Sequence, residues 1–303
     1  MIVTIESAGR EVEISRPDKP LFPDGITKLD LARYYEAVAD FMLPHVEGRP
    51  LNLERYPDGI DGQRIMQQKA SGHFPDWIER VEVAKRGGTV EHVMASDAAT
   101  LVYLANQACI TLHRWLSRAD RLDRPDRLIV DLDPSDGTTT DVRRAAIQIG
   151  DLLRDVGLEP FAMATGSRGY HVVAPLQRRQ DFNAVRAFAR DVARVAAARE
   201  PKRLTTEQRK AKREGRILID IQRNAYAHTA VAPYSVRPRP KAPVATPLDW
   251  DELAEASMRP DRWTLQTLPR RLEREADPWR EMASAARPLG PAQRLLDDLR
   301  RAE

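Results

Sequence analysis

The sequence predicts an α/β fold built on a mixed sheet, and two features in the middle of the chain carry that prediction. Between residues 127 and 224, short apolar runs that end at Pro, Gly or Asp alternate with long amphipathic segments of helical period. This pattern is typical of strands joined by both helices and hairpins. With 303 residues, 42% hydrophobic and 31% charged, the chain is long enough for a substantial core.

The N-terminal part is expected to hold a hairpin, two helices and a strand. Residues 1–14 alternate apolar and polar side chains around a Gly, as a hairpin does. Thr27 with Asp30 is a helix-start signal, and one apolar stripe of helical period follows it. Residues 51–56 predict a strand that ends in a Pro-Asp-Gly turn, and residues 99–115 predict a second helix.

The middle of the chain predicts closely spaced elements, and its end predicts short ones. In order, we expect a strand over 127–132, a helix of about 17 residues, strands over 160–165 and 170–175 around a Gly-Ser-Arg-Gly turn, a helix over 182–198 and a strand within 216–224. A Pro-rich passage over 233–247 then leads to a tail of short helices. Prolines divide that tail, at Pro260, Pro269, Pro278, Pro288 and Pro291.

Composition excludes several classes of protein. No apolar stretch approaches the roughly 18 residues of a membrane span, and the N-terminus lacks the regions of a signal peptide, so we expect no membrane partner and a cytoplasmic location. The single Cys109 excludes a disulfide framework and a Cys-rich zinc site, and its apolar helical surroundings predict a buried thiol.

Positive charge is concentrated in two places, although the net charge is only +3. The segment 202–216 is strongly basic, and 235–241 adds three cations. The first segment is either a solvated helix, since Glu207 and Glu214 can pair with neighbouring bases, or a segment that contacts phosphates.

Acidic side chains mark the ends of two predicted strands. Asp131 and Asp133, in LIVDLDPSDG at 128–137, leave the same face of one strand, and Asp220 ends another. The pair alone indicates either a metal site or ordinary turn chemistry. Neighbouring strands lie about 4.8 Å apart, so three carboxylates can converge and hold Mg²⁺ or Mn²⁺, with room for two ions. Asp136 is interpreted as a turn residue before the next helix.

The turn between the two middle strands supplies groups that suit an anion. Glycines flank Ser167 and Arg168, so backbone amides, a hydroxyl and a guanidinium can approach a phosphate. Taken alone, such a turn is more often a plain hairpin than a phosphate site, and a lone His171 is more often a strand histidine than a catalytic one. Together with three acids, these residues indicate a triphosphate held between cations and metal ions.

The motifs DLDP, TGSRGYHVV, IDIQRN and APYSVR resemble those of the archaeo-eukaryotic primase superfamily. More narrowly, they resemble the polymerase domain of bacterial ATP-dependent DNA ligase D and its stand-alone relatives, and the similarity runs from about Lys19 to Leu253. The resemblance implies one catalytic domain over 1–303, with a DNA-contacting part at 1–125, a catalytic core at 126–250 and C-terminal helices at 251–303. Because no Lys-x-Asp-Gly ligase motif is present, a polymerase without its ligase partner is expected.

The resemblance assigns roles to individual residues. It implies that Asp131, Asp133 and Asp220 are catalytic and bind two ions. It further implies that the nucleotide is bound by Thr165, Ser167, Arg168, His171, Arg223, Arg237 and His113, and that DNA is bound by Lys19, Lys28, Arg55, Ile65 and Met66. Of these, Lys19 and Lys28 match lysines that grip the 5′-phosphate of a gap.

Some positions depart from the family pattern. Ile65 and Met66 stand where many relatives have two adjacent aromatic residues that stack on the template, so about 1 to 3 kcal/mol of base stacking is in doubt. Arg168 stands where ligase-linked members often have Lys. Ile221 to Asn224 replaces a Trp-Ser-Gln-Asn stretch, which puts sugar contacts in doubt. These departures favour a stand-alone branch.

The resemblance implies a DNA-directed nucleotidyltransferase that extends primers, fills short gaps in repair and prefers ribonucleotides and Mn²⁺. Its partners would be NTP or dNTP, gapped or primer-template DNA with a 5′-phosphate, a repair ligase and an end-binding protein, with a monomer working at the nucleoid. Two alternatives are a non-catalytic module that binds DNA gaps or ends and recruits repair partners, and a metal-dependent phosphohydrolase.

Overall fold

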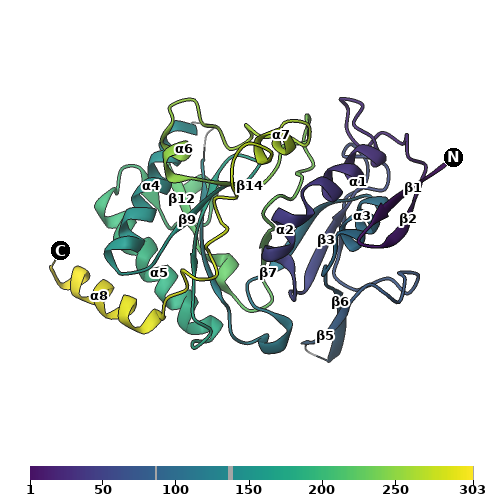
Figure 1. Ribbon diagram of the computed structural model, residues 1–303. Coiled ribbons are helices and arrows are strands. Elements are labelled where there is room, and N and C mark those ends of the chain that lie inside the picture. The colour runs from purple at the N-terminus through teal and green to yellow at the C-terminus, as the bar shows by residue number, and fades with distance from the viewer. Residues whose placement is uncertain (86, 136–138, 303) are drawn as a thin grey trace. The chain divides into compact units, whose positions relative to one another are not determined.

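The computed structural model describes residues 1–85, 87–135 and 139–302, and it divides the chain into two units, each built from three separate segments (Figure 1). Asp136, interpreted above as a turn residue, lies outside the described residues. Unit 1 is formed by Met1–Asp120, Thr229–Ala245 and Trp263–Ala276, and unit 2 by Arg121–His228, Thr246–Arg262 and Asp277–Glu303. The single catalytic domain with three consecutive parts stays a prediction.

Unit 1 combines a hairpin, a sheet and helices. Its strands are β1 (Ile2–Ser7), β2 (Arg10–Ser15), β3 (Leu51–Arg55), β4 (Ile65–Gln67), β5 (Arg80–Lys85), β6 (Gly88–Val93), β7 (Cys109–Trp115) and β13 (Thr229–Val231), and its helices are α1 (Lys28–Ala37), α2 (Ala39–Val46), α3 (Ala98–Asn106) and α7 (Leu268–Leu272). The sheet has the order β13-β7-β3-β6-β5, and β4 pairs with β3. One apolar core of buried side chains, among them Leu31, Met42 and Leu112, joins the helices to this sheet.

Unit 2 is a six-stranded mixed sheet with helices. Its strands are β8 (Arg127–Asp133), β9 (Phe161–Ala164), β10 (Tyr170–Pro175), β11 (Leu204–Thr205), β12 (Ile217–Asp220) and β14 (Thr246–Leu248). Its α-helices are α4 (Thr139–Asp155), α5 (Phe182–Arg199), α6 (Trp250–Ala254) and α8 (Leu289–Ala302), and short 3₁₀ helices lie at Lys210–Lys212 and Gln222–Asn224. A further 3₁₀ helix, Ala119–Arg121, lies where the chain passes from unit 1 to unit 2. The order is β11-β12-β8-β10-β9-β14, with only β11 and β12 parallel. The predicted mixed sheet is therefore confirmed.

Most helices and strands of the structure were predicted from local signals in the sequence. The opening hairpin turns at Ala8 and Gly9, which both have positive φ, as the twist of a two-residue hairpin requires. Thr27 and Asp30 form a complete capping box, in which each side chain accepts a bond from the other residue's backbone N–H. The helix that follows is interrupted at Val38, so the predicted apolar stripe is shared between α1 and α2.

The prediction of a helix over 99–115 is wrong in its second half. Helix α3 ends at Asn106, Ala108 adopts a positive φ of 54°, and the chain continues as strand β7. Strand β7 pairs with β3 on one side and β13 on the other, and nearly all its side chains are buried. Thr111, His113 and Arg114 stand among the apolar residues of this strand, and the segment directly follows the helical pattern of α3, so it was interpreted as part of the helix. Cys109 is buried as expected, but on this strand.

Two further expectations are corrected. The basic segment 202–216 is not a solvated helix, because it contains β11, a loop and one short 3₁₀ turn. The tail contains the short α6 and α7, but α8 extends over 14 residues and includes Pro291. A proline in the first helical turn removes an N–H that has no partner inside the helix, so the helix tolerates it. None of the helices in the described part of the chain is both long and apolar enough to span a bilayer.

The side chain of Asn224 makes the hydrogen bonds to β8 that a neighbouring strand would otherwise make. It is fully buried, its Oδ1 accepts from Ile129 N at 2.9 Å, and its Nδ2 donates to Ile129 O at 2.6 Å and to Ile221 O at 3.0 Å. Because β12 ends at Asp220, the backbone of Ile129 would otherwise lack these partners. The side chain therefore fastens the 3₁₀ turn Gln222–Asn224 to the central strand.

Replacing Asn224 by Ala should lower the free energy of unfolding by roughly 2 to 6 kcal/mol, because two buried backbone groups lose their partners at about 1 to 3 kcal/mol each. Urea denaturation monitored by circular dichroism measures this. Asn183→Ala, an exposed Asn on α5, is the matched control and should change the value by less than about 0.5 kcal/mol. Equal effects of both substitutions would contradict the assigned role.

Candidate metal centre and surrounding polar sites

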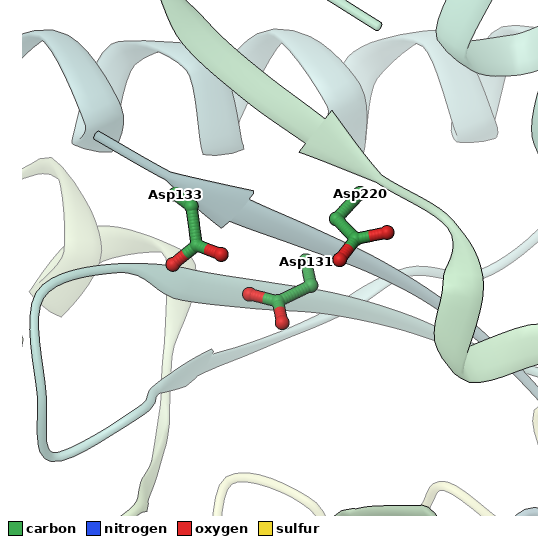
Figure 2. Close-up of side chains that lie close together, drawn as sticks. All are labelled: Asp131, Asp133 and Asp220. Carbon is green, nitrogen blue, oxygen red and sulfur yellow. The ribbon is translucent and has the colours of Figure 1, made fainter. Parts of the chain in front are cut away.

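The register of three strands in unit 2 brings the predicted acidic residues together. Strand β8 lies between β10 and β12, and Asp131 is directly opposite His171 on one side and Asp220 on the other. Val130 and Leu132, both buried, alternate with the acids and point to the opposite face of the sheet. Figure 2 shows the carboxylates of Asp131, Asp133 and Asp220 pointing toward one another, and one oxygen from each lies within 4.8 Å of the others.

Cations partly offset the repulsion among these acids. Asp131 is 5% exposed, and its carboxylate lies 3.4 Å from His171 Nε2 and 3.5 Å from Arg223 Nε. Burial alone would raise the pKa of Asp131, but His171 and Arg223 outweigh burial and hold that pKa below its ordinary value. Burial and then the charge of Asp131 raise the pKa of Asp133. His171 and Arg223 thus leave the charge of Asp133 under-compensated.

The donor set fits a hard divalent cation. Carboxylate oxygens are the ligands that Mg²⁺ and Mn²⁺ prefer, and a divalent ion would relieve the repulsion that raises the pKa of Asp133. The residues that would hold it are Asp131, Asp133 and Asp220. His171 Nδ1 is buried and has no hydrogen-bond partner among the described residues.

The turn after β9 approaches the same strand. Thr165 Oγ1 and Thr165 N both donate to Gly169 O, at 2.9 and 3.1 Å, and close the turn. Only a glycine fits at position 169, because a Cβ there would lie 1.9 Å from Leu132 O. Ser167 is half-buried, and Arg168 is exposed and has no partner for its side chain within the described residues. The structure therefore leaves Arg168 available to an anion.

The two predicted phosphate lysines lie side by side in unit 1. Lys28 N donates to Lys19 O at 2.9 Å, and Lys19 Nζ pairs with Asp58 at 2.8 Å. Lys28 is 4% exposed, and its Nζ donates to Ser15 Oγ and Asn106 Oδ1, both at 3.1 Å. Burial, followed by the charge of Arg16 and then of Lys19, lowers the pKa of Lys28 to about 8. Asn106 was not anticipated, since nothing local in the sequence links it to Lys28.

The predicted template contacts share two strands of unit 1. Arg55 on β3 is opposite Ile65 on β4, and it donates to Gln107 O at 2.8 Å and Gln67 Oε1 at 2.7 Å. Ile65 and Met66 are 36% and 44% exposed, which is unusual for large apolar side chains of this protein. An exposed apolar pair of this kind offers a surface for a base.

A buried carboxylate in the same sheet escaped the sequence analysis. Glu54 accepts from His113 Nε2 at 2.8 Å, from Arg64 Nε at 2.7 Å and from the Tyr56 hydroxyl at 3.1 Å. Burial opposes its charge, but His113 and Arg64 outweigh burial and lower the pKa of Glu54 to about 2. The alternation of LNLER places Glu54 on the polar face of its strand, so the sequence carried no signal that this carboxylate is buried. His113 and Arg237 also belong to unit 1, and their assignment to a nucleotide stays a prediction.

Replacing Glu54 by Gln should lower the free energy of unfolding by an amount that depends on pH. Because the pKa is lowered from 4.5 to about 2, the carboxylate stabilises the folded chain fully above about pH 4.5, and this contribution is lost as the pH falls from about 4.5 to 2. The difference in free energy of unfolding between wild type and Glu54→Gln should shrink over that interval. Denaturant titrations at several pH values measure it.

Glu13→Gln is the control for Glu54, because Glu13 is exposed on β2. Its effect on the free energy of unfolding should stay within about 0.5 kcal/mol throughout. A Glu54→Gln effect that is the same at about pH 3 and pH 7 would show that the charge of Glu54 does not stabilise the fold.

The comparisons with known proteins agree on one family. Residues 27–279 match the family model described as LigD, primase-polymerase domain. The multifunctional non-homologous end joining protein LigD of Mycolicibacterium smegmatis is 32% identical over 252 residues, which cover 82% of this chain and 33% of the relative. The corresponding protein of Pseudomonas aeruginosa is 32% identical over 287 residues, 93% of this chain and 34% of the relative.

A solved structure is similar to this chain in fold as well as in sequence. The polymerase domain from Mycobacterium tuberculosis ligase D in complex with DNA superposes with a TM-score of 0.85 at 30% sequence identity, covering 91% of this chain and 99% of that one. The chain spans about a third of the length of the curated relatives from Mycolicibacterium and Pseudomonas.

Proposed function

This chain belongs to the family of LigD primase-polymerase domains, and on that premise we propose that it extends DNA primers and fills short gaps with nucleotides. Members of the family are nucleotidyltransferases of DNA repair. The observation that carries the proposal is the convergence of Asp131, Asp133 and Asp220 on neighbouring strands beside cationic side chains. The relative of similar fold that was solved with DNA supports a DNA substrate.

The residues of unit 2 have separate roles in nucleotidyl transfer. Divalent ions held by the three acids, Mn²⁺ or Mg²⁺, would lower the pKa of the primer 3′-hydroxyl and neutralise the triphosphate and the leaving pyrophosphate. Asp131 remains ionised as a ligand because His171 and Arg223 lower its pKa. Arg168, exposed on the turn after β9, binds a phosphate and stabilises the negative charge that develops during transfer.

Unit 1 supplies groups that suit the DNA. Lys19 and Lys28 bind the 5′-phosphate at the far side of a gap, and Ile65 with Met66 offers an apolar contact to a template base. We further assign to the chain a preference for ribonucleotides, a role in end joining with a repair ligase and an end-binding protein, and a place at the nucleoid. Extension of a gapped, labelled primer with NTP or dNTP, in Mn²⁺ or Mg²⁺, tests the activity.

Asp133→Asn should abolish activity without lowering stability. Primer extension should fall at least about 100-fold, because a ligand of the ions is lost. The thermal unfolding midpoint, measured in chelator, should stay equal or rise, since the raised pKa of Asp133 means that its charge opposes folding near pH 7. Asp151→Asn, an exposed acid on α4, should change neither quantity. Full extension by Asp133→Asn would overturn the proposal.

The same assay separates the proposed reaction from hydrolysis. Pyrophosphate release by a nucleotidyltransferase requires a primer 3′-hydroxyl, so a 3′-deoxy primer should suppress it. Release that does not depend on the primer would instead identify a phosphohydrolase.

The preference for a 5′-phosphorylated gap should depend on Lys28 and on pH. Wild type should bind gapped DNA more tightly with a 5′-phosphate than with a 5′-hydroxyl, and Lys28→Gln should lose most of that difference. Because the pKa of free Lys28 is lowered to about 8, its charge is present below that pH and is lost above it, so the preference should decline between about pH 7.5 and 9. Fluorescence anisotropy measures both affinities.

Lys85→Gln, an exposed lysine on β5, is the control for Lys28 and should leave the ratio of the two affinities unchanged. An equal ratio for wild type and Lys28→Gln would show that Lys28 does not bind the 5′-phosphate.

A further inference from the structure

The loop between β11 and β12, residues 206–216, carries five cations and two carboxylates. It lies at the edge of the sheet of unit 2, because β11 is the last strand of the order and β12 the next. The cations are Arg209, Lys210, Lys212, Arg213 and Arg216. Their side chains fall into two groups with different roles.

Arg213 and Arg216 hold the loop together. Arg213 donates from Nε to Glu207 O at 3.1 Å and from Nη2 to Gln208 O at 2.8 Å. Arg216 donates from Nε to Arg213 O at 2.9 Å and from Nη2 to Lys212 O at 3.4 Å. These guanidinium groups satisfy backbone carbonyls of the loop, so their role is structural.

The acids of the loop are also occupied. Glu207 accepts the backbone N–H of Arg209 at 2.9 Å, and Glu214 pairs with Arg216 at 3.6 Å. Arg209, Lys210 and Lys212 are exposed, and within the described ranges their side chains have neither a hydrogen bond nor an ion pair. Three positive charges therefore face solvent without internal compensation.

The loop lies close to the acid cluster. Ser135 Oγ donates to Arg216 O at 2.5 Å and ties the end of the loop to the residues that follow β8. Ser135 is two residues beyond Asp133, a separation of at most about 7 Å along the chain. The C-terminal end of the loop is thus held next to the residues that follow Asp133, on the strand that carries two of the three acids.

We propose that Arg209, Lys210 and Lys212 form a phosphate-binding loop for the DNA backbone, distinct from the residues assigned above to nucleotide and 5′-phosphate. Exposed lysines without internal partners suit sequence-independent contact with phosphates, because they release counterions when they bind. Commitment to DNA, and not to the triphosphate, follows from the exposure of all three side chains to solvent, which suits contact with the extended phosphate backbone of a duplex better than enclosure of one triphosphate. This inference rests on the proposed function.

The triple variant Arg209→Gln, Lys210→Gln, Lys212→Gln tests the loop. Binding of a primer-template duplex is measured by fluorescence anisotropy at several salt concentrations, and the slope of log K against log salt is compared with wild type. Each phosphate contact contributes about 0.9 to that slope, so the slope should become shallower by about 2 to 3. The Michaelis constant for the nucleotide, from primer extension, should stay within about twofold.

Two controls accompany the triple variant. Arg190→Gln with Arg294→Gln removes exposed cations from α5 and α8 of the same unit and should leave the slope unchanged. Lys210→Arg with Lys212→Arg keeps the charge and should retain the wild-type slope. Thermal unfolding of each variant confirms that the loop still folds.

The outcomes separate this inference from the proposed function. A wild type that binds DNA and extends primers, with an unchanged slope in the triple variant, would overturn the loop assignment alone. A raised Michaelis constant for the nucleotide with unchanged DNA binding would show that the loop serves the triphosphate and would also overturn it. A wild type that neither binds DNA nor extends a primer would overturn both.

Discussion

The antiparallel pairing of β8 with β10 and β12 is the constraint on which the candidate site depends. It sets Asp131 opposite His171 and opposite Asp220, so three side chains from distant parts of the sequence share one row across the sheet. A shift of one residue in either pairing would turn a side chain to the other face of the sheet, and the three side chains would no longer lie together. The position of the acids is therefore a property of strand register.

Keeping three carboxylates together costs free energy, and the surrounding residues show how the fold tolerates it. His171 and Arg223 stabilise the charge of Asp131, whereas Asp133 has a raised pKa and is left under-compensated. Asn224 pairs with the backbone of β8 and thereby anchors the turn that carries Arg223. Strain of this kind is expected where a site is arranged for a bound cation and not for the stability of the empty protein.

Unit 1 also buries charged side chains, and Glu54 and Lys28 are two examples. Glu54 is fully enclosed but receives three donors, and its low pKa shows that these donors outweigh burial. Lys28 is as deeply buried, yet only neutral groups accept from its ammonium, and its pKa is lowered. The first arrangement is complete within the chain. The second would gain from an added anion, which agrees with the phosphate contact that the family resemblance implies for Lys28.

Local patterns predicted the elements whose signals are contained in a short stretch of sequence. The capping box of α1, the hairpin turn at Ala8 and Gly9 and the short apolar strands of unit 2 follow from such signals. Strand β7 did not, because it follows α3 after only two residues and carries polar residues among its apolar ones, so no clear period of two marks its start. Helix α8 was underestimated, because a proline in the first turn looks the same in sequence as a proline that ends a helix.

The sequence by itself determined the mixed α/β character, the family and the identity of the acids, since these depend on residue types and on spacing along the chain. Only the tertiary structure decided which charges are compensated. It showed that Glu54 pairs with His113, that Lys28 contacts Asn106, and that Arg213 and Arg216 face their own loop while Lys210 and Lys212 do not. The reason is physical: charge compensation depends on distances between residues that are far apart in the chain, and those distances are set by strand pairing and burial.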